Sequence, residues 1–476
     1  HEGGAAFAAE AHGKLTGRPG VLMVTRGPGV LNAAVGIHTA QQDETPLLVF
    51  VGLVPRHQRG RDAFQELDLG QAFGSICKWV HELDQPSRVP EVVSRAWTIA
   101  RSGRPGPVMI GLPEDMLDEA CESPLVPPTP HPRADVGSDT AAEVAFLLGS
   151  AARPLAIAGG SRWSEAAIDL LPQVLPGVPL VTGFRRQDLI DHRLPSFAGS
   201  LGLGADPALV ARVAAADLVL AVGDRLDDPT TDGFTLFPPP GAGRRLVHVH
   251  PEPRELGRVF LPTISIAAEP EAFLRALPPI AGDRARSAWT AAARAGYVAW
   301  SATESVLDEV ARGMREVLPD DAIVTNGAGN FTRPLQRSFA YRRPGRQLAP
   351  VGGSMGYGLP AALAAKLAHP DRVVVCVAGD GDLLMTAQEL ATMMLEGAAV
   401  VVLVVDNGVY GTIRTHQQRR YPGRPIGTTL SNPDFVTFAM SFGMQAERTT
   451  TAPDTVAALR RAVALDRPAL VHLVTE

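Results

Sequence analysis

The fold of this chain is decided by the stretch VVVCVAGDGDLLMTAQELATMMLEGAAVVVLVVDNGVYG (373–411). It contains two apolar, β-branched runs, each followed by a turn rich in Asp, Asn and Gly. A helical stretch around 386–395 lies between them. A buried strand, a helix and a second buried strand in this order are typical of a parallel sheet covered by helices. The pattern therefore predicts a doubly wound α/β domain in this part of the chain.

Polar residues follow both runs at the point where each predicted strand ends. Asp380 follows the first run and Asn407 the second. Ligands of open parallel sheets bind outside the carboxyl ends of the strands. A carboxylate and an amide oxygen meeting there suit Mg²⁺, and the glycines beside Asp380, with a helix N-terminus, favour a phosphate. From the residues alone the alternative stays open that both motifs are turns closing βα loops.

The same alternation of strand-like and helix-like runs continues through three blocks. We predict an α/β protein with three doubly wound parallel-sheet domains, at 1–122, 138–278 and 298–476. The connections are a linker with five prolines at 123–137 and a loose Pro-, Ala- and Arg-containing stretch near 277–298. The strand-like runs lie in 21–29, 45–54, 106–116, 153–160, 178–183, 216–224, 244–251, 321–330, 372–382, 399–408 and 469–476.

Composition narrows the classes of function. The 476 residues are 45% hydrophobic and 20% charged, as in an ordinary globular protein, and the net charge of -6 offers no attraction for nucleic acid or an anionic membrane. The longest apolar runs are too short to cross a bilayer. Three scattered cysteines form neither a metal-ligand spacing nor a disulfide framework, which favours a reducing cytoplasm.

The GDG of 379–381, followed after a helix and a strand by DNGVYG (406–411), resembles the thiamin-diphosphate and metal signature of acetolactate synthase and pyruvate oxidase-like enzymes. Further segments resemble this family in family order across nearly the whole chain. They are HEGGAAF (1–7), TRGPGVLNAAVGI (25–37), RDAFQELD (61–68), RPGPVMIGLPEDM (104–116) and GGSMGYGLPAALAAK (352–366). The resemblance implies pyrimidine-binding, central and diphosphate-binding domains. It also leads us to expect that the first domain lacks its N-terminal part.

The resemblance also implies four groups of cofactor residues. The magnesium ligands are the side chains of Asp380 and Asn407 and the backbone carbonyl of Val409. Met355 matches the residue wedged beneath the cofactor, although plain core packing is the alternative for a Met in GGSMG. The residues implied near the diphosphate are Ala328, Gly329, Asn330, Gly379, Gly381 and Asp382, and those near the aminopyrimidine are Pro28, Gly29, Asn32 and, through its carbonyl, Gly353.

Glu2 matches the catalytic glutamate of the family. There the glutamate hydrogen-bonds a ring nitrogen of the aminopyrimidine and promotes an imino tautomer, which removes the proton from the weakly acidic thiazolium carbon. The carbanion adds to the keto carbon of a 2-oxo acid, and carbon dioxide leaves. Burial in an apolar pocket is expected to raise the proton affinity of such a carboxylate.

Several positions depart from the family pattern. Asp382 replaces a serine, and it either adds a charge near the diphosphate or caps the following helix, which is favoured over metal ligation. Asp406 stands where an asparagine is common. Arg26 replaces a small residue, and it binds either a substrate carboxylate or a surface acid. Gln65 and Lys78 match positions near the substrate entrance.

Two further features leave alternatives open. The segment IRTHQQRRYPGR (413–424) follows the metal loop and is either a lid over the active site or a solvated basic loop. In the central block AVGDRLDD (221–228) resembles the GARFDD segment of FAD-carrying synthases. GSLGLGAD (199–206) lacks the histidine of the neighbouring loop, and IAGGSR (157–162) has two of the usual three glycines. Absence of FAD is therefore favoured over its presence.

The leading hypothesis is an acetolactate synthase-like transferase or lyase that depends on thiamin diphosphate and Mg²⁺. It would decarboxylate a 2-oxo acid and pass the acyl carbanion to a carbonyl acceptor. The alternatives are a simple 2-oxo acid decarboxylase and a catalytically silent cofactor-binding homologue. The resemblance implies active sites at a subunit interface, and hence a homodimer or homotetramer.

Overall fold

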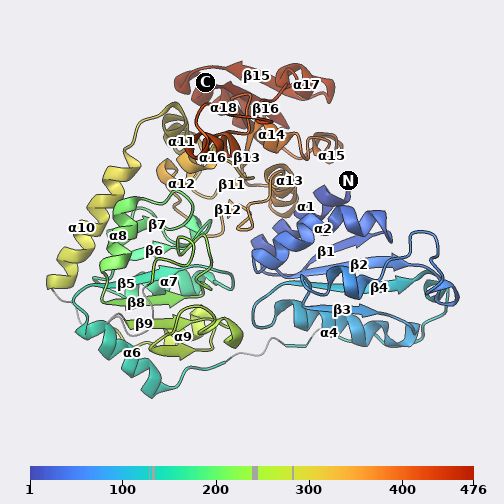
Figure 1. Ribbon diagram of the computed structural model, residues 1–476, viewed down its shortest axis with the longest axis horizontal. Coiled ribbons are helices and arrows are strands. Elements are labelled where there is room, and N and C mark those ends of the chain that lie inside the picture. The colour runs from blue at the N-terminus through green and yellow to red at the C-terminus, as the bar shows by residue number, and fades with distance from the viewer. Residues whose placement is uncertain (128, 131–133, 238–244, 281–283, 476) are drawn as a thin grey trace. The chain divides into compact units, whose positions relative to one another are not determined.

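The structure is a computed structural model that describes residues 1–476 except 128, 131–133, 238–244, 281–283 and 476 (Figure 1). The chain forms two compact units. One comprises His1–Pro132, Ala322–Thr332 and Leu348–Glu476, and the other Arg133–Asp321 and Arg333–Gln347. They contain three parallel sheets with flanking helices, which confirms the predicted α/β class. Within the described ranges, no helix combines the length and the apolar composition that a membrane span requires.

The first sheet of unit 1 is parallel and has the strand order β1-β2-β4-β3. Its central strands β2 and β4 are almost wholly buried, as expected for strands covered on both faces. The strands are β1 (Gly20–Val24), β2 (Leu47–Leu53), β3 (Trp79–Glu82) and β4 (Pro107–Pro113), and the helices are α1 (Glu2–Thr16), α2 (Pro28–Gln42), α3 (Leu69–Phe73), α4 (Val89–Arg101) and α5 (Glu114–Leu117).

The second sheet of unit 1 has the order β12-β11-β13-β14-β16-β15, and its pairs from β11 to β15 are parallel. The strands are β11 (Ile323–Asn326), β12 (Gln347–Leu348), β13 (Val374–Gly379), β14 (Val400–Asp406), β15 (Gln445–Thr449) and β16 (Ala469–Val474). The helices are α13 (Gly358–Ala368), α14 (Asp380–Leu383), α15 (Glu389–Leu395), α16 (Gly411–Arg420), α17 (Phe435–Ser441) and α18 (Ala452–Ala464).

Unit 2 contains a parallel sheet with the order β10-β9-β8-β5-β6-β7. The strands are β5 (Pro154–Ala158), β6 (Leu180–Thr182), β7 (Phe197–Ser200), β8 (Leu218–Val222), β9 (Arg245–Val249) and β10 (Ile264–Ile266). The helices are α6 (Ser138–Ser150), α7 (Glu165–Val174), α8 (Pro207–Ala215), α9 (Pro270–Ala276), α10 (Arg284–Ser301) and α11 (Val306–Val317), with α12 (Thr332–Ser338) beginning in unit 1.

The predicted strand runs all contain strands, whereas the sequence missed β3, β7, β10, β12 and β15. The missed strands are short or half-exposed, and β15 reads QAERT with a largely exposed pattern. They therefore lack the continuous apolar run that marks a buried strand. The stretch near 277–298, expected to be loose, is largely helix α10, and its tryptophan Trp289 donates to the carbonyl of Pro154.

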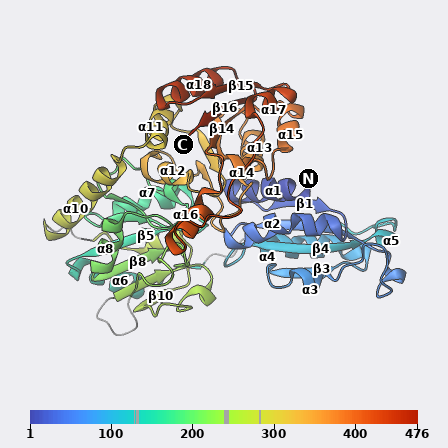
Figure 2. The ribbon, with the colours of Figure 1, turned by 45° about the horizontal axis from the view of Figure 1, so that its top comes forward.

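Helix α1 packs between α2 and α13 and joins the two sheets of unit 1 (Figures 1 and 2). Small residues allow the close approach. A Cβ placed on Gly36 would lie 2.4 Å from the Cβ of Ala6, and one on Gly20 would lie 1.9 Å from the carbonyl oxygen of Ala9. On the other side Phe7 meets the ring of Tyr357 edge-on at 5.6 Å. Larger side chains at these glycines would separate the layers.

A buried carboxyl group lies within this packing. Glu10 is fully buried and accepts hydrogen bonds from the hydroxyls of Thr45 and Tyr357, both at 2.6 Å. Burial, with the charge of Asp43 as the second cause, raises the pKa of Glu10 to about 7, although Lys14 and both hydroxyls act in the opposite direction.

We therefore expect the stability of the protein to fall as the pH rises from about 4.5 to about 7. In this window the folded state keeps a proton on Glu10 that the unfolded state has lost, so the free energy of unfolding decreases, by on the order of 3 kcal/mol. Thermal melts across this pH range should show the fall in the wild type. Glu10→Gln should flatten it, whereas Glu143→Gln, on the exposed surface of α6, should leave the profile unchanged. An unchanged slope in Glu10→Gln would contradict the assignment.

Candidate active site

The carboxyl ends of three neighbouring parallel strands meet at one edge of the second sheet of unit 1. Strand β13 lies between β11 and β14, in a register that pairs Asn326 with Val377 and Gly379 with Val405. The segments that follow these strands are 327–330, 380–382 and 407–409. The structure thus confirms that Asp380 and Asn407 follow adjacent strands.

Asp380 accepts three hydrogen bonds at this edge. Its Oδ2 accepts from the backbone N–H of Gly408 at 2.9 Å and from Nδ2 of Asn432 at 2.8 Å, and its Oδ1 accepts from the N–H of Gly381. The adjacent Asn407 accepts from the N–H of Val409 at 3.2 Å. These bonds tie the loop after β13 to the loop after β14.

Gly411, the first residue of α16, lies near the side chains of Asn407 and Asn330. A Cβ on Gly411 would lie 3.4 Å from Nδ2 of Asn407 and 3.7 Å from Nδ2 of Asn330. The loop after β11, which carries Asn330, is therefore close to the loop after β14. The structure brings together the residues implied for the metal and those implied for the diphosphate.

A second carboxylate, Asp406, faces the same region. It accepts from Asn432 at 2.8 Å, from the N–H of Gly408 at 3.0 Å and from Nε2 of His472 at 2.9 Å. Burial raises the pKa of Asp380, and the nearby Asp406 adds to that rise. Burial also acts to raise the pKa of Asp406, but its hydrogen bonds, led by the one from His472, outweigh burial and lower it.

The donor set fits a hard cation. Two carboxylates share one amide donor, and the Oδ1 of that amide, on Asn432, is buried with no hydrogen-bond partner among the described residues. A cation bound beside Asp380 would relieve the like-charge contact between Asp380 and Asp406. Within the described part of the chain there is no group of three or more His, Cys, Asp or Glu suited to a metal, so amide and carbonyl oxygens would have to complete the shell.

Asp382 has a role that the sequence interpretation missed. It is buried, and its Oδ1 accepts from the backbone N–H of Ala328 at 3.1 Å and of Gly356 at 2.9 Å. The prediction that it caps the following helix is wrong, because Gln388 is the N-cap residue of α15 and Asp382 lies inside the short helix α14. Its carboxylate instead joins three loops of the site.

The segment before α13 presents an open glycine. Gly353 has φ +70, and no atom lies within 4 Å of the position that a Cβ would take. A ligand can therefore approach its backbone closely. Met355 is half-buried and does not belong to the buried core, so plain core packing does not describe it. The next residue, Gly356, is held by Asp382 and by the hydroxyl of Thr386, which donates to its carbonyl at 2.7 Å.

Glu2 opens helix α1 and lies beside α2. Its Oε2 accepts from Nδ2 of Asn32 at 3.1 Å, and its Oε1 lies 3.4 Å from the Cβ position of Gly29. Glu2, Gly29 and Asn32 are thus brought together at the start of α2, where Pro28 is the first helical residue. The raised proton affinity expected from burial in an apolar pocket stays a prediction, because Glu2 is only half-buried in the structure. A backbone hydrogen bond, then the bond from Asn32, lowers the pKa of Glu2.

The three residues predicted near the substrate have different surroundings. Arg26 pairs with Glu114 at 3.2 Å, which is the surface ion pair foreseen as the alternative. Gln65 has φ +65 and packs its backbone against Gly27, which places it beside the start of α2. Positive φ in a residue other than glycine is strained, and such strain gathers at functional sites.

Lys78 does not join Arg26 and Gln65. It precedes β3, at the amino edge of the sheet, and donates to the carbonyl of Ile99 at 2.5 Å and to that of Ser102. The physical reason is that the last carbonyls of α4 have no partner within the helix, and a lysine satisfies them.

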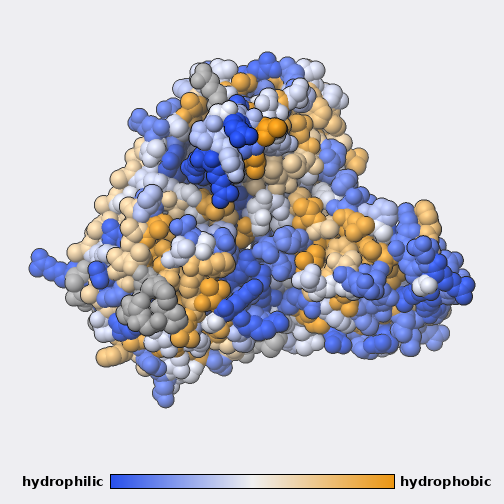
Figure 3. All heavy atoms as spheres, viewed as in Figure 1, coloured by the Kyte–Doolittle hydropathy of each residue, from blue (hydrophilic) through white to orange (hydrophobic). Residues whose placement is uncertain are grey.

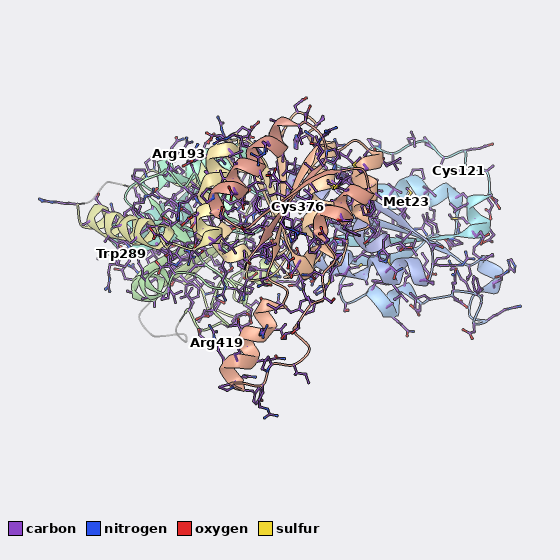
Figure 4. All side chains as sticks on the ribbon, turned by 90° about the horizontal axis from the view of Figure 1, so that it is seen from above. Met23, Cys121, Arg193, Trp289, Cys376 and Arg419 are labelled. Atoms are coloured by element: carbon purple, nitrogen blue, oxygen red, sulfur yellow. The ribbon has the colours of Figure 1, made fainter. Side chains whose placement is uncertain are left out.

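The basic segment 413–424 is mostly helix rather than loop. It forms most of α16, none of whose residues is buried, and Figure 4 shows Arg419 on the part that stands out from the ribbon. The two ends of the excursion, residues 410 and 428, are joined by a hydrogen bond, because Tyr410 donates its N–H to the carbonyl of Thr428 at 2.8 Å. Whether it covers the site stays a prediction.

Two site residues escaped the sequence analysis. His472 lies in the apolar strand β16, and a single polar residue in a buried strand beside the one that carries Asp406 was a usable signal. Asn432 lies in a segment without secondary structure that reads SNPD (431–434), and no pattern in the sequence distinguishes it.

Three family models match the chain. They are described as the N-terminal TPP binding domain, the central domain and the C-terminal TPP binding domain of thiamine pyrophosphate enzymes, and they match residues 1–72, 141–277 and 327–473. The fold and the site edge are thus those of a thiamin-diphosphate-dependent enzyme.

Curated relatives narrow the class. A probable acetolactate synthase 2, chloroplastic, of Oryza sativa subsp. japonica is 33% identical over 512 residues, which cover 100% of this chain and 76% of the relative. The acetolactate synthase large subunit of Parasynechococcus marenigrum is 33% identical over 94% of this chain and 76% of the relative. The acetolactate synthase isozyme 2 large subunit of Escherichia coli K12 is 29% identical over 99% and 87%. The chain belongs to the acetolactate synthase-like family of thiamin-diphosphate-dependent enzymes.

Asp382→Ala should destabilise the protein by about 2–4 kcal/mol, because it leaves two partly or fully buried N–H groups without their charged acceptor. Denaturant unfolding measures this loss. Asp382→Asn keeps an acceptor oxygen in place and should cost less than half as much. Equal stability of Asp382→Ala and the wild type would show that the carboxylate does not hold the three loops.

Proposed function

We propose that this enzyme uses Mg²⁺ and thiamin diphosphate to decarboxylate a 2-oxo acid and to transfer the acyl carbanion to a carbonyl acceptor. The observation that carries the proposal is the edge formed after β11, β13 and β14. There Asp380, Asn407 and Asn330 meet beside glycine-rich loops and an orphaned amide oxygen. Such an edge suits a divalent cation with a diphosphate.

Each group of residues has its own task in this proposal. Asp380 and Asn407, with the carbonyl of Val409, would hold the cation, and Asn432 would keep Asp380 oriented. The residues of the loop after β11, from Ala328 to Asn330, would donate to the diphosphate. When bound, thiamin diphosphate supplies the carbanion that attacks the keto carbon and accepts the electrons left by carbon dioxide.

Glu2 would hold a proton at a ring nitrogen of the pyrimidine. In the free chain its carboxylate already has one donor, Asn32, and its pKa is lowered. Contact with an apolar ring in place of water acts in the opposite direction and favours the protonated form. The shift in proton affinity that the reaction needs would thus come with the cofactor and its surroundings.

A second copy of the chain is the proposed partner. Large apolar side chains are exposed on the edge strand β1 and on α2, and Figure 3 shows hydrophobic atoms gathered over this region. Exposed apolar patches of this kind mark interaction sites. They are Val21, Met23, Leu31 and Val35. We propose that the active enzyme is at least a homodimer, with Glu2 reaching the cofactor across the subunit interface.

The test is to add pyruvate to the purified protein with thiamin diphosphate and Mg²⁺, and to measure carbon dioxide and acetolactate. We expect both products, loss of activity with a chelator, and recovery with Mg²⁺. Glu2→Gln should lower kcat by about 10²-fold or more, the usual contribution of an acid–base group, with little change in cofactor affinity. Carbon dioxide with an aldehyde instead of acetolactate would favour a simple decarboxylase. Release of no carbon dioxide from any 2-oxo acid would refute both.

We further propose that the central domain holds no FAD. A buried carboxylate, that of Asp224, lies at the edge where a dinucleotide would bind, at the carboxyl ends of β5, β6 and β8. Oδ2 of Asp224 lies 1.8 Å from the Cβ position of Gly159 and 2.0 Å from that of Gly183, so it packs directly on both glycines. The ring of Phe184 packs in the same way on Gly202. A buried carboxylate at this edge opposes a pyrophosphate by both charge and volume.

The absorption spectrum of the purified protein should therefore lack flavin bands. Incubation with FAD followed by gel filtration should leave none bound, because Asp224 packs on the glycines that a pyrophosphate would have to approach. Free flavin passed through the same column serves as the control. Flavin retained in a fixed ratio to protein would contradict this proposal without touching the one on thiamin diphosphate.

A further inference from the structure

The segment 349–357, which leads into α13, has no helix or strand of its own and is held from outside. Besides the bonds of Gly356 with Asp382 and Thr386, its contacts come from α1, from α2 and from Asp43 directly after α2. The hydroxyls of Ser354 and Thr39 lie 2.7 Å apart, and Tyr357 donates to Glu10 at 2.6 Å. This segment carries Gly353 and Met355, the residues implied at the cofactor.

Asp43, directly after α2, makes the central contact. Its Oδ1 accepts from two consecutive backbone N–H groups, those of Val351 at 2.8 Å and Gly352 at 3.3 Å. Its Oδ2 pairs with Nζ of Lys14 at 2.6 Å. The side chain of Asp43 is 0% exposed. One carboxylate thus binds both the turn that precedes Gly353 and the ammonium group of α1.

Lys14 completes the arrangement from the last turn of α1. Its Nζ also donates to the carbonyl of Ala349 at 2.6 Å, and its side chain is 6% exposed. The ammonium group of Lys14 therefore holds the segment at one carbonyl, and the carboxylate of Asp43 holds it at two N–H groups. Because both charges are buried and paired with each other, removal of one leaves the other uncompensated.

The backbone conformation of Gly353 depends on these bonds to Asp43 and Lys14. Its φ of +70 lies in the left-handed region, and its N–H bonds to the carbonyl of Pro350 within the same turn. The turn has no sheet or helix ladder to fix it. The charge-assisted bonds from Asp43 to the residues just before Gly353 supply that constraint.

We propose that Asp43 and Lys14 form a positioning pair that sets the affinity of the enzyme for thiamin diphosphate by holding the segment 349–354. The inference rests on the proposed function, in which this segment meets the pyrimidine. Neither residue touches the reacting atoms. They act through the carbonyl and the conformation of Gly353, so binding is preorganised by the domain that also carries Glu2.

Calorimetric titration with Mg²⁺ and thiamin diphosphate tests the pair without any turnover. Asp43→Asn keeps the volume but puts an amide against Lys14, and it should weaken cofactor binding about tenfold, as expected for loss of a charged partner. Hydrogen exchange should become faster at the amides of Val351 and Gly352 and stay unchanged in β13.

The matched control is Asp308→Asn in unit 2. Asp308 is also 0% exposed and paired with an arginine, Arg337, so we expect Asp308→Asn to lower the melting temperature to a similar degree. A merely structural role would make both variants alike in cofactor affinity. We expect only Asp43→Asn to bind weakly, and Lys14→Met combined with Asp43→Asn to be less than additive.

A milder variant guards against misfolding. Thr39→Val removes the hydroxyl that meets Ser354 and that also donates to the carbonyl of Val35 within α2. Loss of the neutral bond to Ser354 should weaken binding about threefold. If a folded Asp43→Asn and Thr39→Val both bind the cofactor as the wild type does, the positioning role is wrong. If the wild type itself binds no thiamin diphosphate, the proposed function fails first.

Discussion

Parallel pairing of β11, β13 and β14 is the constraint on which the site depends. Parallel strands place all their carboxyl ends at one edge, so loops far apart in the chain must meet there. Hydrogen bonds then join the loops to one another, with Asp380 bonded to the loop after β14 and Asp382 to the loop after β11. Burial of the apolar strands stabilises the sheet, and the buried carboxylates of Asp380 and Asp382 hold the loops in position relative to one another.

The sequence predicted those parts of the site that follow directly from strand order. Asp380 and Asn407 each come immediately after a long apolar run, and adjacent strands bring them together. Asn432 belongs to a segment without a ladder, and only the folded chain shows that it bridges two acids. Asp is a common helix cap, but in the folded chain the carboxylate of Asp382 accepts from the N–H groups of Ala328 and Gly356 in two other loops.

Lys78 and Glu2 show a second limit of pattern reasoning. A motif match gives a position along the chain, whereas the role depends on which unsatisfied groups lie within reach. Lys78 donates to carbonyls at the end of α4 instead of reaching the site. A backbone hydrogen bond at the start of α1, then the bond from Asn32, lowers the pKa of Glu2. The fold class was predicted correctly because long buried strands have a continuous apolar run in their own sequence. The edge strand β15 has no such run, and it forms because it pairs with β16.

The excursion that contains α16 has a consequence for variation within the family. It leaves the fold after Tyr410 and returns at Thr428, and the isolated bridge between Val409 and Thr429 closes its neck. Because none of the residues of α16 is buried, sequence and length between these points can change without disturbing Asn407 and Val409 just before them. The segment between Tyr410 and Thr428 can therefore vary in sequence and length among related chains while the sheet edge that it leaves keeps its structure.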